Sequence, residues 1–329
     1  MSTVQRYLEN FKLTCPLEFD QPLRDFTTFQ VGGPADVLAR PRTESELREI
    51  LAVTHGSTDS REVVSEGGHA DGQSAAPKGD PIPVWVLGGG ANIVVSDAGV
   101  RGVVVYLGDL TEISRIGTVL TAQAGAAISD VAAYAADHEL QGLEFIYAMP
   151  GSVGGAVWMN ARCYGGEIFP VLQRVHYVTR AGTPGIYIPR SADFGYKISP
   201  FQDGSRIITK VEFSLTAAPG QRESLWQMMR AHEADRRDKG HFAYPCAGSI
   251  FKNDRSFGRP SGQIIDEHGL RGHTRGGARV SEKHGNIIVN AGDATAADIR
   301  ALVTDVQTQI AEATGYHLDP EVLFIGDWS

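Results

Sequence analysis

Three polar residues occupy sequence surroundings that suit chemistry. Ser249 lies between a glycine and two bulky apolar residues, Glu321 directly precedes an apolar run of four residues, and Lys197 follows a Phe-Gly-Tyr segment. A carboxyl group that is partly removed from water favours its protonated form, so Glu321 is a candidate hydrogen-bond donor. Lys197 is a candidate cation directed into a pocket. The residue types alone favour ordinary structural roles, as a turn serine, a strand-edge acid and a solvated lysine.

Two glycine-rich segments indicate a phosphate-bearing ligand. One follows the apolar run Val84–Leu87, and the other is predicted to be a loop within 149–160. Glycine lets backbone N–H groups approach a phosphate closely, so two such loops suggest one long ligand with a central pyrophosphate, such as a dinucleotide cofactor. Neither segment reads G-x-G-x-x-G, so the Rossmann fingerprint is absent. The candidate cofactor-binding residues are Gly88, Gly89, Gly90, Ala91, Asn92, Pro150, Gly151, Ser152, Val153, Gly154 and Gly155.

Other site types receive little support from the sequence. The ten histidines show no metal-ligand spacing, so no metal is expected. A Gly-x-Ser-x-Gly nucleophile elbow does not occur, and neither glycine segment ends in the Lys-Ser/Thr pair of a P-loop. Lys252 and Asn253 are candidate ligands for a phosphate or a sugar, although an exposed turn pair is the alternative.

Composition limits the partners. The 329 residues are 42% hydrophobic and 21% charged, as in a soluble enzyme, and the net charge of −9 argues against nucleic acid or an anionic membrane. No apolar run approaches the ~18 residues of a membrane span, and the N-terminus lacks a signal-peptide core. Three widely spaced cysteines favour a reducing compartment over a disulfide framework. We therefore expect a cytoplasmic protein, and a monomer.

The chain divides into three predicted parts. Residues 1–83 form a small N-terminal domain with a Gly-, Ser-, Asp- and Pro-rich segment at 55–83, interpreted as a mobile surface insertion. Residues 84–218 are rich in short strands, and residues 219–329 return to helices. Many strands with few helices indicate an α+β fold. The best-marked helices are expected to begin at Thr43, with a capping box to Glu46, and to span 129–139, 223–237 and 295–314.

Seven motifs, in one order along nearly the whole chain, resemble the UDP-N-acetylenolpyruvoylglucosamine reductase family, whose members are also called UDP-N-acetylmuramate dehydrogenases. Each motif alone is weak, but their common order is specific. They are Thr27-Thr-Phe-x-Val-Gly-Gly-Pro-Ala-Asp36, Leu87-Gly-Gly-Gly-Ala-Asn92, Pro150-Gly-Ser-Val-Gly-Gly155 with Met159-Asn160, Phe194-Gly-Tyr196, Ala247-Gly-Ser-Ile-Phe-Lys252, Val280-Ser-Glu-Lys-His-Gly-Asn286 and Leu318-Asp-Pro-Glu-Val322.

The resemblance implies a three-domain flavoprotein. Its FAD-binding domain of the vanillyl-alcohol-oxidase (PCMH) type would span 84–218, with an FAD-contacting N-terminal domain and a substrate-binding domain at 219–329. It further implies non-covalent FAD, NADPH as reductant, and reduction of UDP-N-acetylglucosamine enolpyruvate to UDP-N-acetylmuramate during peptidoglycan precursor synthesis. The short join after Leu215 is typical of the subtype that lacks a long substrate-capping loop.

The resemblance also assigns site residues. The family's catalytic serine and glutamate fall on Ser249 and Glu321. The candidate substrate-binding residues are Tyr196, Lys252 and Asn253. The family's catalytic arginine is replaced by Lys197, which keeps the charge but loses the bidentate fork. Either Lys197 serves with another geometry, or a nearby arginine supplies the fork, the candidates being Arg236, Arg237, Arg275 and Arg279.

Two rival functions remain open on the sequence. The chain is alternatively another FAD-dependent oxidoreductase, acting on a hydroxy acid or sugar with oxygen as acceptor. The second rival is a non-catalytic protein that binds a sugar nucleotide or a flavin, for which Lys197 in the arginine position is the only support.

Overall fold

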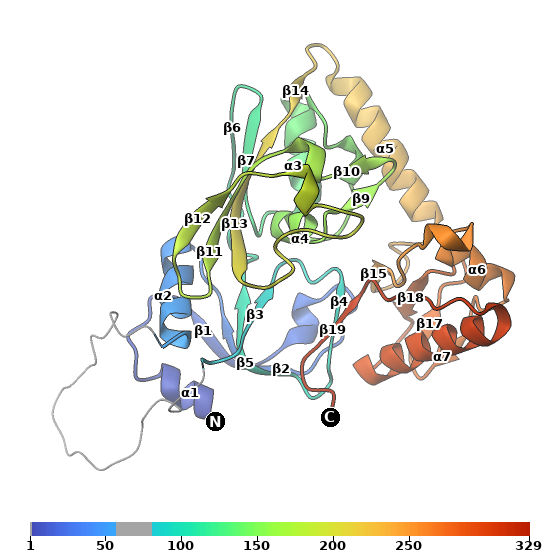
Figure 1. The fold of residues 1–329 in the computed structure, drawn as a ribbon, viewed down its shortest axis with the longest axis horizontal. Helices are drawn as coiled ribbons and strands as arrows, with labels where there is room; N and C mark the ends of the chain where they lie inside the picture. Colours follow the sequence, from blue (N-terminus) through green and yellow to red (C-terminus); the bar gives the residue numbers. More distant parts are fainter. Residues whose placement is uncertain (1, 57–80) are drawn as a thin grey trace. The chain divides into compact units, whose positions relative to one another are not determined.

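A computed structural model describes residues 2–56 and 81–329, so most of the predicted insertion at 55–83 lies outside the described residues. The chain forms two compact units built from interleaved segments (Figure 1). Unit 1 comprises residues 1–21, 35–88 and 101–226, and unit 2 comprises residues 22–34, 89–100 and 227–329. The predicted division into three domains stays a prediction.

Unit 1 contains two sheets. The first has the strand order β1-β2-β5-β3, in which β3 and β5 run parallel, and the second is an antiparallel sheet ordered β12-β11-β13-β7-β6. Their strands are β1 (Leu17–Pro22), β2 (Pro34–Ala39), β3 (Val84–Leu87), β5 (Val100–Tyr106), β6 (Ile113–Ile116), β7 (Val119–Gln123), β11 (Leu172–Thr179), β12 (Pro184–Tyr187) and β13 (Arg206–Ser214).

Short elements complete unit 1. Two small ladders pair β8 (Leu140–Gln141) with β14 (Thr216–Ala217) and β9 (Arg162–Cys163) with β10 (Gly166–Glu167). The helices are α1 (Thr3–Leu8), α2 (Glu44–Thr54), α3 (Ile128–Asp137), α4 (Val153–Trp158) and the beginning of α5 (Arg222–Asp238). Single 3-10 turns occur in this unit at Glu144–Ile146, Phe169–Val171 and Ser191–Asp193.

Unit 2 is built on a four-stranded antiparallel sheet with the order β15-β18-β17-β16, on which helix α7 packs through β16 and β17 (Figure 1). A separate parallel pair joins β4 to β19. The elements are β4 (Ile93–Val95), β15 (Cys246–Ser249), α6 (Ser261–Glu267), β16 (Thr274–Arg275), β17 (Ala278–Val280), β18 (Ile287–Asn290), α7 (Ala296–Thr314) and β19 (Leu323–Ile325), with 3-10 turns at Leu23–Phe26 and Arg255–Phe257.

Each unit has its own hydrophobic core, as the periodicity of the sequence predicts. Along β11, every third residue from Leu172 to Val178 is buried, because two register shifts in its pairing with β13 interrupt the strict alternation of the strand. Helix α7 buries the predicted stripe at helical spacing, namely Ile299, Leu302, Val303, Val306 and Ile310.

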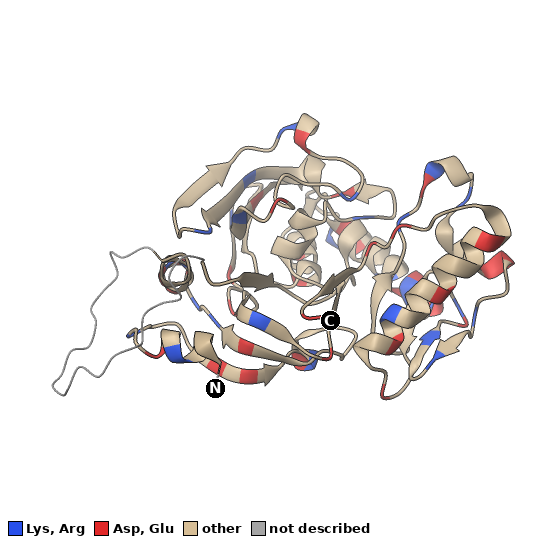
Figure 2. Cartoon of the chain, turned by 60° about the horizontal axis from the view of Figure 1, so that its bottom comes forward, with Lys and Arg blue, Asp and Glu red and all other residues tan. Residues whose placement is uncertain are grey.

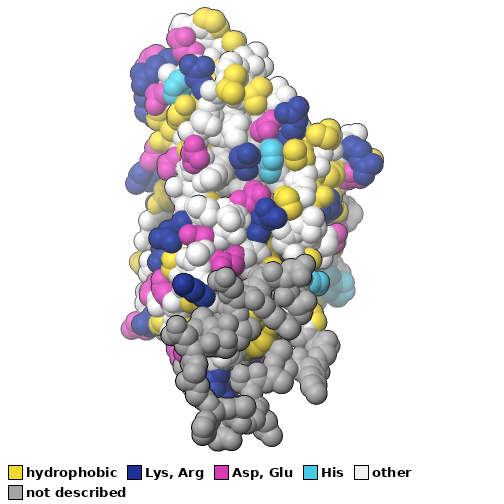
Figure 3. Space-filling model, turned by 90° about the vertical axis from the view of Figure 1, so that its left-hand side faces the viewer, with side chains coloured by type: hydrophobic (Ala, Val, Ile, Leu, Met, Phe, Trp, Pro, Cys, Tyr) yellow, Lys and Arg dark blue, Asp and Glu magenta, His cyan; other side chains and the backbone are white. Residues whose placement is uncertain are grey.

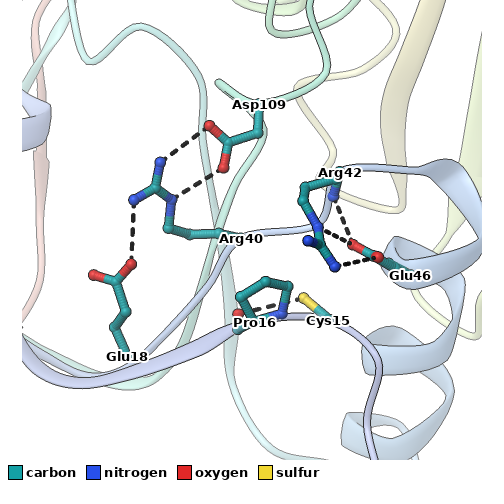
Figure 4. Close-up of polar contacts among 7 residues, drawn as sticks. All are labelled: Cys15, Pro16, Glu18, Arg40, Arg42, Glu46 and Asp109. Carbon is teal, nitrogen blue, oxygen red and sulfur yellow. Dashed lines mark hydrogen bonds and ion pairs between the residues drawn. The ribbon is translucent and has the colours of Figure 1, made fainter.

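The predicted helix caps are partly confirmed. Thr295 caps α7 and forms a full capping box with Asp298. Thr43 also caps α2, accepting a hydrogen bond from the Glu46 N–H at 3.1 Å. The second half of the predicted box is wrong, because the Glu46 carboxylate instead accepts hydrogen bonds from the backbone N–H and guanidinium of Arg42 (Figure 4). Arginine offers a charged partner, which binds a carboxylate more strongly than the backbone N–H of the cap.

The prediction of a loop throughout 149–160 is also wrong. Residues 153–158 form the short helix α4, which begins after Ser152 because the Ser152 hydroxyl accepts a hydrogen bond from the Gly155 N–H. Glycine is a poor helix former, but two glycines are tolerated here because the Val153 and Gly154 N–H groups of the first turn donate to the Ala126 and Ala124 carbonyls outside the helix.

Charged side chains of both signs are interspersed on the surface. The face in Figure 3 mixes Lys and Arg with Asp and Glu among its described residues, and the ribbon in Figure 2 shows both signs distributed along the chain. Helix α7, for example, contains both Arg300 and Asp305. In unit 1, Arg40 bridges Asp109 and Glu18, with a bidentate contact to Asp109 (Figure 4). Among the described helices, none is long and apolar enough to cross a membrane.

The three cysteines are all free, as expected from their spacing. Cys15 lies beside Pro16 at the start of β1 and is 3% exposed (Figure 4). Burial, assisted by the nearby negative charge of Glu46, raises the pKa of the Cys15 thiol to about 12. Because the thiolate is the reactive form, this cysteine is expected to be chemically inert.

Two half-buried histidines lie together in unit 2. The ring centroids of His241 and His284 are 6.1 Å apart. Burial, followed by the positive charge of Arg236 and by His284, lowers the pKa of His241 from 6.5 to about 4. Burial lowers the pKa of His284 as well. Both imidazoles are therefore neutral in the folded protein at neutral pH.

The lowered pKa of His241 predicts a loss of folding stability in acid. An unfolded His241 takes up a proton near pH 6.5, whereas the folded one does so only near pH 4, so its contribution to the free energy of unfolding is complete above pH 6.5 and is lost as the pH falls toward 4. His241→Gln, which does not titrate, should flatten the fall of the denaturation midpoint across this window, leaving the share that His284 contributes. Identical pH dependence in the variant and the wild type would contradict it.

Candidate active site

Ser249 lies at the end of β15, directly after a β-bulge. Along β15 the paired positions advance from Cys246 to Ser249, while along β18 they advance only from Val289 to Ile287. The first strand therefore contains one extra residue. Gly248 sits inside the bulge with φ +72°, a left-handed conformation that glycine adopts without strain. The glycine is thus needed for the backbone path that presents Ser249.

The segment after Ser249 is paired with the side chain of Asn286, which is 3% exposed. Its Oδ1 accepts a hydrogen bond from the Phe251 N–H and its Nδ2 donates one to the Phe251 carbonyl, both at 2.8 Å. The Asn286 carbonyl accepts a third from the Ile250 N–H at 2.9 Å. Asn286 thus continues the ladder beyond the bulge. It falls in one of the seven motifs, but no role was predicted for it, and its only sequence signal is an asparagine directly before an apolar strand.

Glu321 lies beside this segment. Its N–H donates a hydrogen bond to the Ile250 carbonyl at 2.7 Å, and Pro320 forms a bridge with Phe251. The Asn92 amide in turn donates to the Glu321 carbonyl at 3.0 Å. Ser249 and Glu321 are both half-buried. The backbone contact brings the segments of these two predicted catalytic residues together within unit 2, and Asn92, the last residue of the first glycine segment, contacts Glu321 there.

The two candidate ligands that follow Ser249 also have partners within unit 2. The Lys252 ammonium forms an ion pair with Asp319 at 2.7 Å, and its N–H donates to the Asp319 carbonyl at 2.9 Å. The Asn253 Oδ1 accepts a hydrogen bond from the Ser261 N–H at 2.9 Å. Both side chains are thereby oriented by their neighbours, and Lys252 carries a charge that is partly neutralised by Asp319.

Lys197 and Tyr196 belong to unit 1, in a tight turn closed by a bridge between Gly195 and Ile198. Lys197 has φ +60°, which is costly for a residue with a side chain and persists only where neighbours impose it. The Gln202 side chain donates to the Lys197 carbonyl at 2.9 Å, and the Asn160 side chain donates to the Gly195 carbonyl at 2.8 Å. Tyr196 is exposed and Lys197 half-buried.

The two glycine segments meet within unit 1. A Cβ on Gly88 would lie 2.3 Å from the Ser152 hydroxyl oxygen, so only glycine fits where the segments touch. Gly90 has φ +59°, and a Cβ there would lie 2.0 Å from the Phe26 carbonyl oxygen in unit 2. The low bulk predicted for these loops is therefore a packing requirement, which fits a backbone that approaches a diphosphate closely.

The two segments differ in their available donors. The Val153 and Gly154 N–H groups donate to the Ala126 and Ala124 carbonyls at 2.9 and 2.8 Å, so they are not the bare donors that the sequence suggested. Within the described residues, the N–H groups of 88–90 donate no hydrogen bond to protein. The first segment is therefore the better source of N–H donors, and the second offers mainly a surface of low bulk.

Three of the four arginines considered as substitutes for Lys197 take part in ion pairs. Arg275 contacts the Asp305 carboxylate through two guanidinium nitrogens, and Arg237 contacts Glu233 at 2.9 Å. Arg279 lies over the Tyr244 ring, 5.2 Å from its centroid, and 3.6 Å from a Glu282 oxygen. Because the Arg275 guanidinium is occupied by its bidentate contact with Asp305, Arg275 does not offer a guanidinium for a substrate carboxylate.

Two family models match separate parts of the chain. A family model described as "FAD binding domain" matches residues 75–184, and one described as "UDP-N-acetylenolpyruvoylglucosamine reductase, C-terminal domain" matches residues 240–325. The chain is 38% identical to the UDP-N-acetylenolpyruvoylglucosamine reductase of Treponema denticola, with 95% of this chain and 94% of the relative covered. It is 41% identical to that of Borrelia garinii, with 92% of each covered.

A solved structure agrees. The crystal structure of the reductase from Thermus caldophilus superposes with a TM-score of 0.73 at 30% identity, covering 95% of this chain and 100% of that chain. The α+β flavoprotein fold expected from the sequence is thereby confirmed, and so is the resemblance carried by the seven motifs. The chain belongs to the UDP-N-acetylenolpyruvoylglucosamine reductase family.

Proposed function

We propose that this chain reduces UDP-N-acetylglucosamine enolpyruvate to UDP-N-acetylmuramate through bound FAD, with NADPH as reductant, in peptidoglycan precursor synthesis. Family membership across nearly the whole chain supports the reaction. The observation that carries the proposal is the pairing of the Ser249 segment with Glu321 through the Ile250 carbonyl, because it places a hydroxyl and a carboxyl on adjacent backbone segments.

The reaction adds one hydride and one proton across the enolpyruvyl double bond. Bound FAD would supply the hydride chemistry, for which NADPH is the proposed reductant and carbon 3 of the substrate the proposed acceptor. The electron pair of the double bond then moves toward the substrate carboxylate, giving an enediolate, and returns to form the new C–H bond at carbon 2. The protein must hold the charge and supply the proton.

Each proposed site residue has one task in this scheme. Ser249 donates its hydroxyl proton to carbon 2, and solvent restores that proton afterwards. A protonated Glu321 donates a hydrogen bond to the developing oxyanion. Lys197 stabilises the same charge electrostatically, which needs no bidentate fork. Tyr196, Lys252 and Asn253 are proposed to contact the substrate.

The two glycine segments, 88–92 and 150–155, would hold the cofactor. Their fit rests on the glycines that cannot carry a Cβ and on the N–H groups of 88–90. We also propose the subtype without a long capping loop, since residues 218–221 alone connect β14 to α5. A cytoplasmic location is supported by the three free thiols, which persist in a reducing compartment.

The function is tested by following the flavin spectrum of the purified protein without oxygen. NADPH should bleach the flavin band, and UDP-N-acetylglucosamine enolpyruvate should then restore it. The two half-reactions are independent readouts, because the reductant and the substrate act in separate steps. A protein that binds no flavin, or whose reduced flavin returns only with air, would contradict the proposal and favour one of the two rivals.

The role of Ser249 predicts an effect on one half-reaction only. Ser249→Ala should leave the bleaching by NADPH unchanged and slow the return of colour with substrate by about 10²–10⁴-fold, the usual contribution of a positioned proton donor. Ser256→Ala, an exposed serine in the same unit, serves as the matched control and should resemble the wild type. Equal losses in both half-reactions would exclude proton donation by Ser249.

The charge on Lys197 predicts a graded response. Lys197→Ala should slow reoxidation by substrate about 10²–10³-fold, because one stabiliser of the developing charge is removed. Lys197→Arg should retain or raise the rate, since the charge remains. Lys210→Ala, another lysine of unit 1, provides the control in stopped-flow measurements. Wild-type kinetics in Lys197→Ala would remove this residue from the site.

A further inference from the structure

The bulge at Gly248 creates a backbone problem next to Ser249. Phe251 is 1% exposed, so its N–H and carbonyl need partners, and its position lies beyond the last paired position of β15 with β18. A buried backbone group without a hydrogen bond is strongly disfavoured. The Asn286 side chain resolves this, because its amide offers one acceptor and one donor in the arrangement of a peptide group.

Asn286 is itself held on several sides. Its backbone N–H donates to Nδ1 of His284 at 3.1 Å, so this ring nitrogen acts as the acceptor. On the α6 side, a Cβ at Gly262 would lie 3.2 Å from the Asn286 Cβ and 3.0 Å from the His284 ring, so a glycine there leaves room for both. Asn286 is therefore held by contacts other than its pairing with Phe251, so the pairing couples the Phe251 backbone to a fixed side chain.

Backbone hydrogen bonds connect Asn286 with the segments that carry Ser249 and Glu321. Ile250 lies between the two paired residues: its N–H donates to the Asn286 carbonyl at 2.9 Å, and its carbonyl accepts from the Glu321 N–H at 2.7 Å. Ser249 directly precedes it. A shift of this segment therefore moves the Ser249 hydroxyl and the Glu321 backbone together.

We propose that Asn286 is a positioning residue that sets the geometry of Ser249 and Glu321 for protonation of the substrate. The inference rests on the proposed function. In this scheme Asn286 contacts neither the reacting carbon atoms of the substrate nor the transferred hydride. Its side chain supplies the hydrogen bonds to Phe251 that a paired strand would otherwise provide beyond the bulge. A small misplacement of a reacting group lowers the rate strongly, because catalysis depends on near-attack geometry.

Two substitutions test the proposal, with Asn290→Ala as the matched control. Asn290 lies at the other end of β18 and donates to the Phe29 carbonyl at 3.1 Å, outside the proposed site. In Asn286→Ala, reoxidation of the reduced flavin at saturating substrate should slow about 10²-fold, while bleaching by NADPH stays unchanged. The solvent deuterium isotope effect on reoxidation should rise, because proton transfer becomes the slow step.

Asn286→Asp provides a readout that a purely structural role would not move. A neutral carboxyl group keeps both contacts, accepting from the Phe251 N–H and donating to its carbonyl, whereas the ionised form repels that carbonyl. Reoxidation in this variant should therefore approach the wild-type rate at low pH and fall as the pH rises. The wild type and Asn290→Ala should share one pH profile that differs from that of Asn286→Asp, because residue 286 does not titrate in either of them. If Asn286→Ala does not fold, the pH profile of Asn286→Asp decides.

The outcomes separate the two proposals. If substrate never reoxidises the wild-type flavin, the proposed function and the positioning role both fail. If the wild type is active and both Asn286 variants match Asn290→Ala, the positioning role alone is overturned. The same holds if the Asn286 variants lose NADPH-dependent bleaching to the same extent as reoxidation, or if Asn286→Asp shows the pH profile of the wild type.

Discussion

The hydrogen bond from the Glu321 N–H to the Ile250 carbonyl is the constraint on which the proposed site depends. It joins two segments that are about seventy residues apart in the chain, and at 2.7 Å it is a backbone contact that does not depend on side-chain identity. The C-terminal segment then continues into β19, which pairs with β4, so the contact is supported on both sides. Neither proposed donor would be held in place without this junction.

The first glycine segment is tied to the same junction. Gly88 packs against Ser152 in unit 1, while Asn92 donates to the Glu321 carbonyl in unit 2. A run of five residues thus begins among the groups proposed to hold the cofactor and ends beside Glu321, the proposed hydrogen-bond donor to the oxyanion. Glycine suits the start of this run because a Cβ on Gly88 would clash with Ser152, whereas the end of the run makes its contact through the Asn92 side chain.

Much of the architecture was predictable because it follows local periodicity. Helix α7 and its cap were visible as a stripe of apolar residues after Thr295, and most strands of the antiparallel sheet were visible as short apolar runs. Helix α4 was missed because its first turn is stabilised by the Ala124 and Ala126 carbonyls, which lie far away in the sequence. The role of Asn286 was not predictable for the same reason, since its partner, Phe251, becomes a neighbour only after folding. The catalytic assignments came from family resemblance, as the residue types alone favoured ordinary roles.

The bulge in β15 has a consequence for how this short strand tolerates length changes. Residues three apart in a regular strand project to opposite faces, but Cys246 and Ser249 are paired with Val289 and Ile287, which share a face. The additional residue therefore reverses the parity of the strand. Deleting Ala247 or Gly248 would restore the regular two-residue spacing, and Ser249 would still lie opposite Ile287 on the same face, whereas a strand that kept all four residues without the bulge would turn the Ser249 hydroxyl to the other side of the sheet. The face on which Ser249 lies is thus set by its pairing with Ile287 and not by its separation from Cys246 along the chain.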